Sequence, residues 1–340
     1  MRRCRVAAFA AVLVAHAVSA DPLVERARQA FAPLPAGTTA PADPATEAEV
    51  ALGRMLYFDA RLSKNHDVAC NTCHRLDSYG VDGQPTSAGH RGLRGPRNAP
   101  TVYNAALHVA QFWDGRAADV EAQARSPVLD RFEMAMPDEA AVVAVLRSIP
   151  GYAPRFAEAF PGEAQPITYD NVARAIGAFE RRLVTPSRFD RFLEGDAGAL
   201  GAQEKRGLET FLDTGCTACH NGPLVGGALF QKLGLVEPVA SEDRGRAEVT
   251  GKATDEFFFK VPSLRNVEKT GPWFHDGSVG TLDMAVRLMA RHQLGRTLSG
   301  AEAASIVAFL RALTGDLPEA YVARPELPPS GPQTPPPDPT

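Results

Sequence analysis

Cys70-Asn71-Thr72-Cys73-His74 and Cys216-Thr217-Ala218-Cys219-His220 are two copies of one motif, Cys-x-x-Cys-His. Two thiols at this spacing can form thioethers with both vinyl groups of one haem, and the adjacent histidine can then bind the iron. Zinc sites and redox-active dithiols share the Cys-x-x-Cys spacing, but they do not need the histidine. Of the five cysteines only Cys4 lies outside the motifs, so no pair is left for a disulfide. The motifs therefore predict two covalently bound haem c groups and a redox protein.

Residues 1–20 have the organisation of a secretory signal peptide. Arg2, Arg3 and Arg5 precede an apolar run, and the small residues 18–20 form a cleavage site before Asp21. The apolar run is shorter than the roughly 20 residues that a membrane span needs. No later segment is long and apolar enough to span a membrane. We therefore expect an exported, soluble protein of the periplasm.

Composition limits the partners. Removing residues 1–20 removes three arginines and no acid, so the formal net charge changes from −4 to −7. This mildly acidic chain has no run of basic residues, which argues against nucleic acid as a partner. Residues 325–340 are rich in proline and lack apolar periodicity, which predicts a disordered tail.

The two halves of the chain repeat the same order of segments. A predicted short helix precedes each haem motif, at residues 50–58 and 203–212. Residues 98–102 (NAPTV) lead to 112–116 (FWDGR), and residues 261–266 (VPSLRN) lead to 273–278 (WFHDGS). The parallel order indicates two diverged copies of one cytochrome c-like unit.

Apolar periodicity predicts a mostly α fold. Further helices are expected at residues 138–148, at 168–183 and from the capping box at 299–302 to Gly315, while 257–259 is the best strand candidate. Thr185, Pro186 and several glycines interrupt the periodicity near residues 184–200. We therefore expect an N-terminal haem domain over residues 21–190 and a C-terminal haem domain over residues 191–320.

The second axial ligand of each iron decides the chemistry, because a filled site favours electron transfer and an open one permits peroxide binding. His90 lies in residues 80–100, where eight of 21 residues are glycine or proline, so it could bind and also leave. Met284 and Met289 lie five residues apart on one predicted helix. They therefore face different directions, and at most one can reach a given haem. Spacing alone does not choose between them. The other candidates are His66, His108, His275, His292, Met55, Met134 and Met136.

Over about residues 45–318 the sequence resembles the bacterial di-haem cytochrome c peroxidases, within the superfamily that also contains MauG. The motifs that carry this resemblance are both haem motifs, residues 97–101 (RNAPT), 112–116 (FWDGR), 259–266 (FKVPSLRN) and 274–277 (FHDG).

The resemblance implies a role for each half. The N-terminal haem would be the low-potential, peroxidatic one, bound by His74 and by His90 as the removable distal ligand. Gln123 and Glu133 match the distal glutamine and glutamate, although residues 130–132 (DRF) are unlike the family's usual run. Trp113 matches a tryptophan between the haems.

The C-terminal haem would be the high-potential one, bound by His220 and Met289. MauG-type enzymes usually have tyrosine at the latter position, which favours the peroxidase. A calcium ion between the domains would be bound by the side chain of Asn98 and the backbone carbonyls of Thr270 and Pro272.

The resemblance thus implies a cytochrome c peroxidase that reduces hydrogen peroxide to water. The electrons would come from a small periplasmic cytochrome c or a cupredoxin, and we expect a homodimer. Two alternatives stay open: a MauG-type oxidase that modifies a partner protein, and a non-catalytic di-haem electron carrier.

Overall fold

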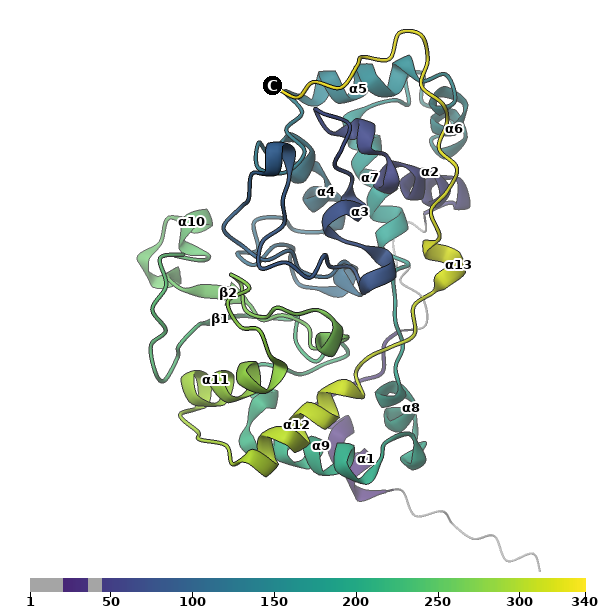
Figure 1. The fold of residues 1–340 in the computed structure, drawn as a ribbon. Coiled ribbons are helices and arrows are strands. Elements are labelled where there is room, and N and C mark those ends of the chain that lie inside the picture. The colour runs from purple at the N-terminus through teal and green to yellow at the C-terminus, as the bar shows by residue number, and fades with distance from the viewer. Residues whose placement is uncertain (1–20, 36–44) are drawn as a thin grey trace, which may run out of the picture.

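The computed structural model describes residues 21–35 and 45–340, so the predicted signal peptide lies outside the described residues. The fold is mostly helical, as predicted, with two short strands in the described part. Figure 1 shows two helical lobes joined by extended segments. None of the helices in the described ranges combines the length and the apolar composition needed to cross a membrane.

The N-terminal lobe packs its helices around the pair α2 and α7. Helix α2 begins at the predicted capping box: Thr46 Oγ1 accepts from Glu49 N–H at 3.1 Å, and the Glu49 carboxylate accepts from Thr46 N–H at 2.8 Å. The apolar faces of both helices are buried in one core. The helices of this lobe are α2 (Glu47–Phe58), α3 (Cys70–Cys73), α4 (Val120–Leu129), α5 (Glu139–Ser148), α6 (Tyr152–Ala159) and α7 (Tyr169–Glu180).

The C-terminal lobe is built around the pair α9 and α12. Ser299 caps α12 as predicted, with its hydroxyl accepting from Glu302 N–H at 3.2 Å. The strand expected at residues 257–259 forms one residue later, and Lys260 pairs with Phe230 in an antiparallel ribbon. The elements of this lobe are α8 (Arg188–Glu194), α9 (Ala202–Thr214), β1 (Phe230–Lys232), α10 (Ala247–Thr250), β2 (Phe258–Lys260), α11 (Leu282–Leu294) and α12 (Gly300–Arg311).

Both ends of the described chain differ from expectation. Helix α1 (Pro22–Arg28), assigned to the N-terminal domain by its position in the sequence, packs in the core of the C-terminal lobe. Residues 325–340 form no helix or strand, but they lie along the N-terminal lobe instead of extending freely (Figure 1). There Thr334 Oγ1 bonds to the Ser148 hydroxyl at 3.0 Å, and Asp338 N–H donates to Lys64 O at 2.9 Å. This proline-rich segment is held by polar contacts to α5 and to the loop near Lys64, and composition alone does not reveal such contacts.

Each lobe contains a helix crossing that requires a glycine. A Cβ atom at Gly53 of α2 would lie 1.7 Å from Ala175 O of α7. A Cβ atom at Gly207 of α9 would lie 1.8 Å from Ser305 O of α12. In each lobe the helix before the haem motif therefore touches the backbone of the lobe's last long helix, which supports the internal duplication.

The two copies also bond to each other reciprocally. Asn98 N–H donates to His275 O at 2.7 Å, and Lys260 N–H donates to Trp113 O at 2.7 Å. Residues 98 and 260 occupy the same place in the two copies, as do residues 113 and 275. The lobes are therefore joined by an approximate two-fold arrangement of equivalent segments.

We expect Gly207→Ala to lower the free energy of unfolding by about 1–3 kcal/mol, because the added methyl group must displace the backbone of α12. Gly300→Ala, at the first residue of the partner helix α12, is the control, since nothing lies within 4 Å of a Cβ atom there. It should change stability by less than about 1 kcal/mol. Urea unfolding of both variants tests this; equal stabilities would contradict the close crossing.

Candidate functional site

The N-terminal haem motif lies on α3, directly below α2. Tyr57 of α2 donates its hydroxyl hydrogen to His74 O at 2.8 Å, and Thr72 Oγ1 accepts from Ala69 N–H at 2.9 Å. Burial raises the pKa of Cys70, and it raises the pKa of Cys73 to about 11. Both thiols are therefore neutral at physiological pH and sit in an apolar setting.

A cavity of about 30 Å³ adjoins this motif, and it brings Gln123 and Glu133 together with Cys70, Cys73 and His74. Gln123 lies on α4, and Glu133 lies in the turn that follows this helix. Burial raises the pKa of Glu133 to about 7, with a further contribution from Asp130. The cavity thus contains the amide group of Gln123 and the carboxyl group of Glu133. The carboxyl group can exchange a proton near neutral pH.

Sequence reasoning missed a second acid in this cavity. Glu180 ends α7 and lines the same space; its pKa is raised to about 8, first by burial and then by Glu121. The sequence contains a feature that could have identified this residue. Glu180 is the one acid on the apolar face of α7, four residues after Ile176.

His90 does not line this cavity. Its backbone N–H donates to Glu133 O at 2.7 Å, so the loop lies close to the predicted acid. The imidazole is buried, but its Nε2 faces Thr340 O at 3.5 Å. The structure therefore brings the His90 loop next to Glu133, with the ring directed toward the C-terminal residue.

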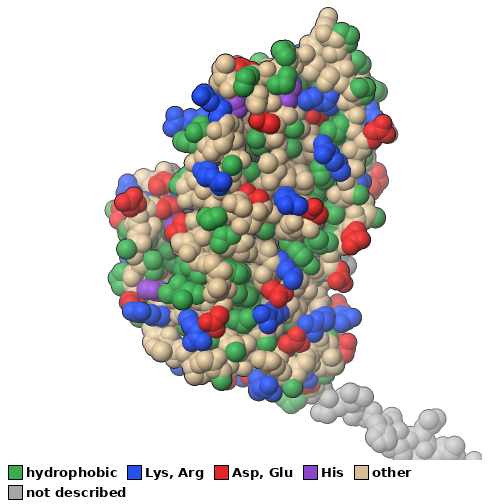
Figure 2. Space-filling model, viewed as in Figure 1, with side chains coloured by type: hydrophobic (Ala, Val, Ile, Leu, Met, Phe, Trp, Pro, Cys, Tyr) green, Lys and Arg blue, Asp and Glu red, His purple; other side chains and the backbone are tan. Residues whose placement is uncertain are grey.

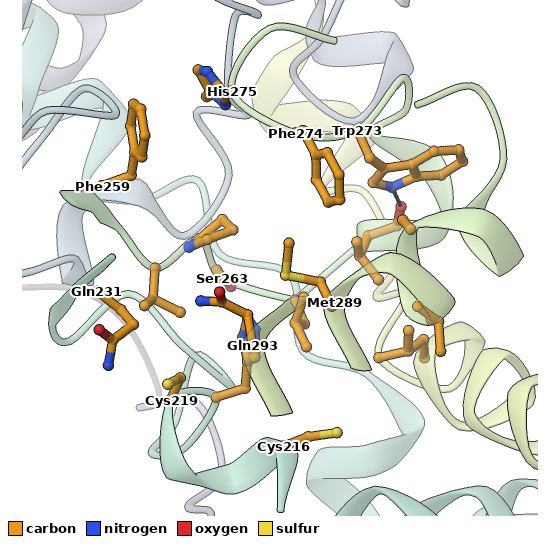
Figure 3. A pocket seen from close by; sticks show the side chains of 18 of the residues that line it. Cys216, Cys219, Gln231, Phe259, Ser263, Trp273, Phe274, His275, Met289 and Gln293 are labelled. Carbon is orange, nitrogen blue, oxygen red and sulfur yellow. Dashed lines mark hydrogen bonds between the residues drawn. The ribbon is translucent and has the colours of Figure 1, made fainter. Parts of the chain in front are cut away.

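The C-terminal haem motif adjoins a much larger cavity, of about 240 Å³. Cys216, Cys219, His220 and Met289 all line it, and Figure 3 shows the Met289 side chain extending from α11 into this space. Met284 is 51% exposed and lies outside the cavity. Figure 2 shows hydrophobic side chains gathered between the strands and α11, where this cavity lies. Of the two methionines on α11, the structure thus brings only Met289 to the motif.

Both motif histidines are neutral imidazoles, and a backbone carbonyl group holds the ring of His220. Burial lowers the pKa of His74, opposed by the carbonyls of Gly80 and Pro100. Burial lowers the pKa of His220 to about 4, and its Nδ1 lies 3.3 Å from Val225 O. An imidazole whose Nδ1 faces a carbonyl keeps Nε2 free for a metal.

The donor sets fit haem at both motifs. Each offers two thiols and a partly buried neutral imidazole, and the C-terminal cavity adds a thioether and predominantly apolar walls. The N-terminal cavity is much smaller, so a macrocycle at that motif requires the surrounding side chains to move outward.

The residues expected between the haems also line the larger cavity: Trp113, Asn98, Thr270 and Pro272. The Trp113 indole N–H donates to Asn98 O at 2.9 Å, and the Asn98 amide donates to Gln84 O at 2.9 Å. No cluster of three His, Cys, Asp or Glu side chains that could hold a metal ion occurs in the described ranges. A cation here would therefore be bound by amide and carbonyl oxygens.

Sequence reasoning assigned no role to Lys260 and left His108 as one of several ligand candidates. Both line the larger cavity, where Lys260 is buried and His108 partly buried, and they contact each other. The sequence signal was a lysine between the apolar residues Phe259 and Val261.

Comparisons with known proteins agree with this geometry. A family model described as di-haem cytochrome c peroxidase matches residues 47–198. The cytochrome c551 peroxidase of Pseudomonas aeruginosa is 45% identical over 93% of this chain and 92% of its own length. The chain belongs to the di-haem cytochrome c peroxidase family. The family implies two haem c groups, one for each motif.

Other relatives show the breadth of the family. The cytochrome c551 peroxidase of Nitrosomonas europaea is 47% identical over 84% of both chains. The methylamine utilization protein MauG of Methylorubrum extorquens is 37% identical over 84% of this chain and 83% of its own. Among solved structures, a MauG-like protein associated with microbial copper homeostasis superposes with a TM-score of 0.77 at 27% identity, covering 86% of this chain and 97% of that one.

We expect Met289→Ala to lower the reduction potential of the C-terminal haem and to remove the near-infrared sulfur-to-iron band, because a thioether ligand raises haem potential. Met284→Ala is the matched control on the same helix, and its exposed side chain should leave both unchanged. Spectroelectrochemical titration checks this. The reverse pattern would show that Met284 is the ligand.

Proposed function

We propose that this protein is a cytochrome c peroxidase of two cytochrome c-like domains, which reduces hydrogen peroxide with two electrons and two protons to two waters. The observation that carries the proposal is the N-terminal cavity, where Gln123 and Glu133 adjoin a haem-binding motif. An electron carrier with permanently filled iron sites has no use for a proton-exchanging carboxyl group beside its haem.

The chain supplies proton transfer and orientation at this cavity. When bound, the N-terminal haem supplies the iron that takes peroxide and passes electrons to it. Glu133 moves a proton from the inner to the outer peroxide oxygen, which turns the leaving oxygen into water. Gln123 donates a hydrogen bond that positions the peroxide. Burial of Glu133 suits this work, because a carboxyl group that titrates near pH 7 can both accept and return a proton.

Electrons enter at the C-terminal motif. Met289 as a ligand makes that haem the one of higher potential, so it accepts electrons from a small cytochrome c or a cupredoxin. Trp113 lies in the wall of the larger cavity and carries the backbone carbonyl that bonds to Lys260 of the other lobe. It is therefore the natural residue for passing electrons between the lobes.

A calcium ion would stabilise this junction. Asn98 would bind it with its side-chain oxygen, and Thr270 and Pro272 with their backbone carbonyls, a set of hard oxygen ligands that suits calcium. The signal sequence at residues 1–20 supports export to the periplasm. A homodimer completes the proposal and follows from the family resemblance alone.

A MauG-type oxidase that modifies a partner protein is the second candidate, and the 37% identity to MauG favours it. Met289 argues for the peroxidase, because the thioether occupies the position where MauG-type enzymes usually have tyrosine. Turnover of peroxide with a reduced small cytochrome separates the two, since the oxidase needs its own protein substrate.

We expect Glu133→Gln to lose about 10²–10⁴-fold of peroxide turnover while both haems stay bound, because the amide keeps the size of the side chain but cannot shuttle a proton. Glu158→Gln, an exposed glutamate on α6, is the matched control and should keep wild-type turnover. Steady-state peroxide reduction by reduced small cytochrome c, with and without prior half-reduction, is the assay. Near-normal turnover of Glu133→Gln would remove this residue from the mechanism.

His90 gives a separate prediction. If it is a removable ligand of the N-terminal iron, His90→Gly should give a high-spin ferric haem without any pre-reduction. His66→Gly is the control, since the His66 backbone N–H bonds to Ser63 O and not, as that of His90 does, to Glu133 O beside the N-terminal cavity. An electron paramagnetic resonance spectrum of His90→Gly that stays low-spin would show that His90 is not the ligand.

A further inference from the structure

The buried Lys260 and the partly buried His108 form a pair that the peroxidase mechanism does not use. Lys260 ends β2 and is 5% exposed, and its Nζ lies 2.6 Å from His108 Nδ1. An ammonium group has no lone pair, so it donates and His108 Nδ1 accepts. The remaining imidazole proton is then on Nε2, which is buried without a hydrogen-bond partner among the described residues.

No carboxylate balances this cation within the described part of the chain. The carboxylates of Asp114 and Asp243 both bond to Arg97 and not to Lys260. Burial lowers the pKa of Lys260 to about 7, and burial together with the charge of Lys260 lowers that of His108. A buried ammonium without a counter-ion and a buried N–H without an acceptor are costly, so both donors require an anion.

The location of the pair indicates which anion this is. Both side chains line the cavity of about 240 Å³ that also contains Cys216, Cys219 and His220. The walls of this cavity are predominantly apolar, so the acceptor has to belong to the molecule that fills the space. A haem carries two ionised groups at its edge, its propionate carboxylates.

The internal duplication gives an independent reason to expect a cation here. Lys260 occupies in the second copy the place that Asn98 occupies in the first, and His108 corresponds in the same way to Thr270. The reciprocal bonds from Asn98 N–H to His275 O and from Lys260 N–H to Trp113 O fix this correspondence in space. The approximate two-fold axis therefore relates Lys260 and His108 to two proposed calcium ligands, Asn98 and Thr270. At the Lys260 position, an ammonium group supplies the positive charge that the metal ion would supply at the other.

We propose that Lys260 and His108 together bind a haem propionate, with the ammonium and the Nε2–H of the imidazole as donors. This inference rests on the di-haem assignment made above. The pair raises the reduction potential of the haem that it holds, because a fixed positive charge favours the reduced form. The cavity extends to Trp113 between the lobes, so the propionate belongs to one of the two haems. The haem whose reduction potential depends on Lys260 is the one that carries it.

Potentiometric titration of the intact di-haem protein, without peroxide, tests the proposal. Lys260→Met removes the charge and keeps the length of the side chain. A fixed positive charge near the iron favours the reduced form, so losing it should lower the reduction equilibrium constant of one haem about tenfold. The haem that shifts is the one whose propionate is bound. Lys252→Met, at an exposed position, is the matched control and should shift neither haem.

Unchanged potentials of both haems in Lys260→Met would overturn the proposal. If that variant does not retain both haems, His108→Phe decides, because it removes the imidazole donor and leaves the ammonium in place. A fall in one haem potential then supports the proposal, and two unchanged potentials overturn it. Haem potentials and peroxide turnover are measured independently. If a potential shifts in Lys260→Met but the wild-type protein does not reduce peroxide, the proposed function is wrong and the propionate site stands.

Discussion

One buried hydroxyl group joins the two halves of this molecule. Thr185 Oγ1 accepts hydrogen bonds from the side chains of Asn104 at 2.9 Å and Asn266 at 2.8 Å, and all three residues are buried. The two asparagines occupy equivalent places in the internal repeat, and both adopt a left-handed backbone near φ +60°, which asparagine tolerates better than most residues. Their segments continue into the reciprocal bonds between the lobes. This shared anchor therefore fixes how the two haem motifs face each other, and any electron transfer between them depends on it.

The duplicated unit has diverged in what surrounds each motif. At the N-terminal motif, Gln123, Glu133 and Glu180 supply an amide and two acids whose pKa values are raised by burial. At the C-terminal motif, Met289 supplies a thioether, and the mostly apolar walls contain few groups that can donate a proton. The proposed proton transfer and electron acceptance are thus assigned to different lobes. The lobes meet at Trp113, beside the Lys260–His108 pair.

The sequence predicts those parts of the molecule that local chemistry controls. Helices α2 and α12 begin at their predicted capping boxes, and the helical pitch shows that Met284 and Met289 cannot face the same site. Features that depend on long-range packing were not predictable: α1 joins the C-terminal lobe, and the proline-rich tail is held by hydrogen bonds from residues far away in the sequence. Lys260 was hidden for a related reason, because a lysine in a motif is usually exposed, and only the folded structure shows its partner and the lack of a counter-ion.

The central claim is that two unlike haem sites are coupled across one junction. Low-temperature electron paramagnetic resonance of the half-reduced protein tests it most directly. We predict that the first electron removes the signal of the Met289-ligated haem and, at the same time, converts the remaining ferric signal from low-spin to high-spin as its sixth position opens. If the remaining ferric haem keeps its low-spin spectrum unchanged through half-reduction, the two sites are independent electron carriers and the account is wrong.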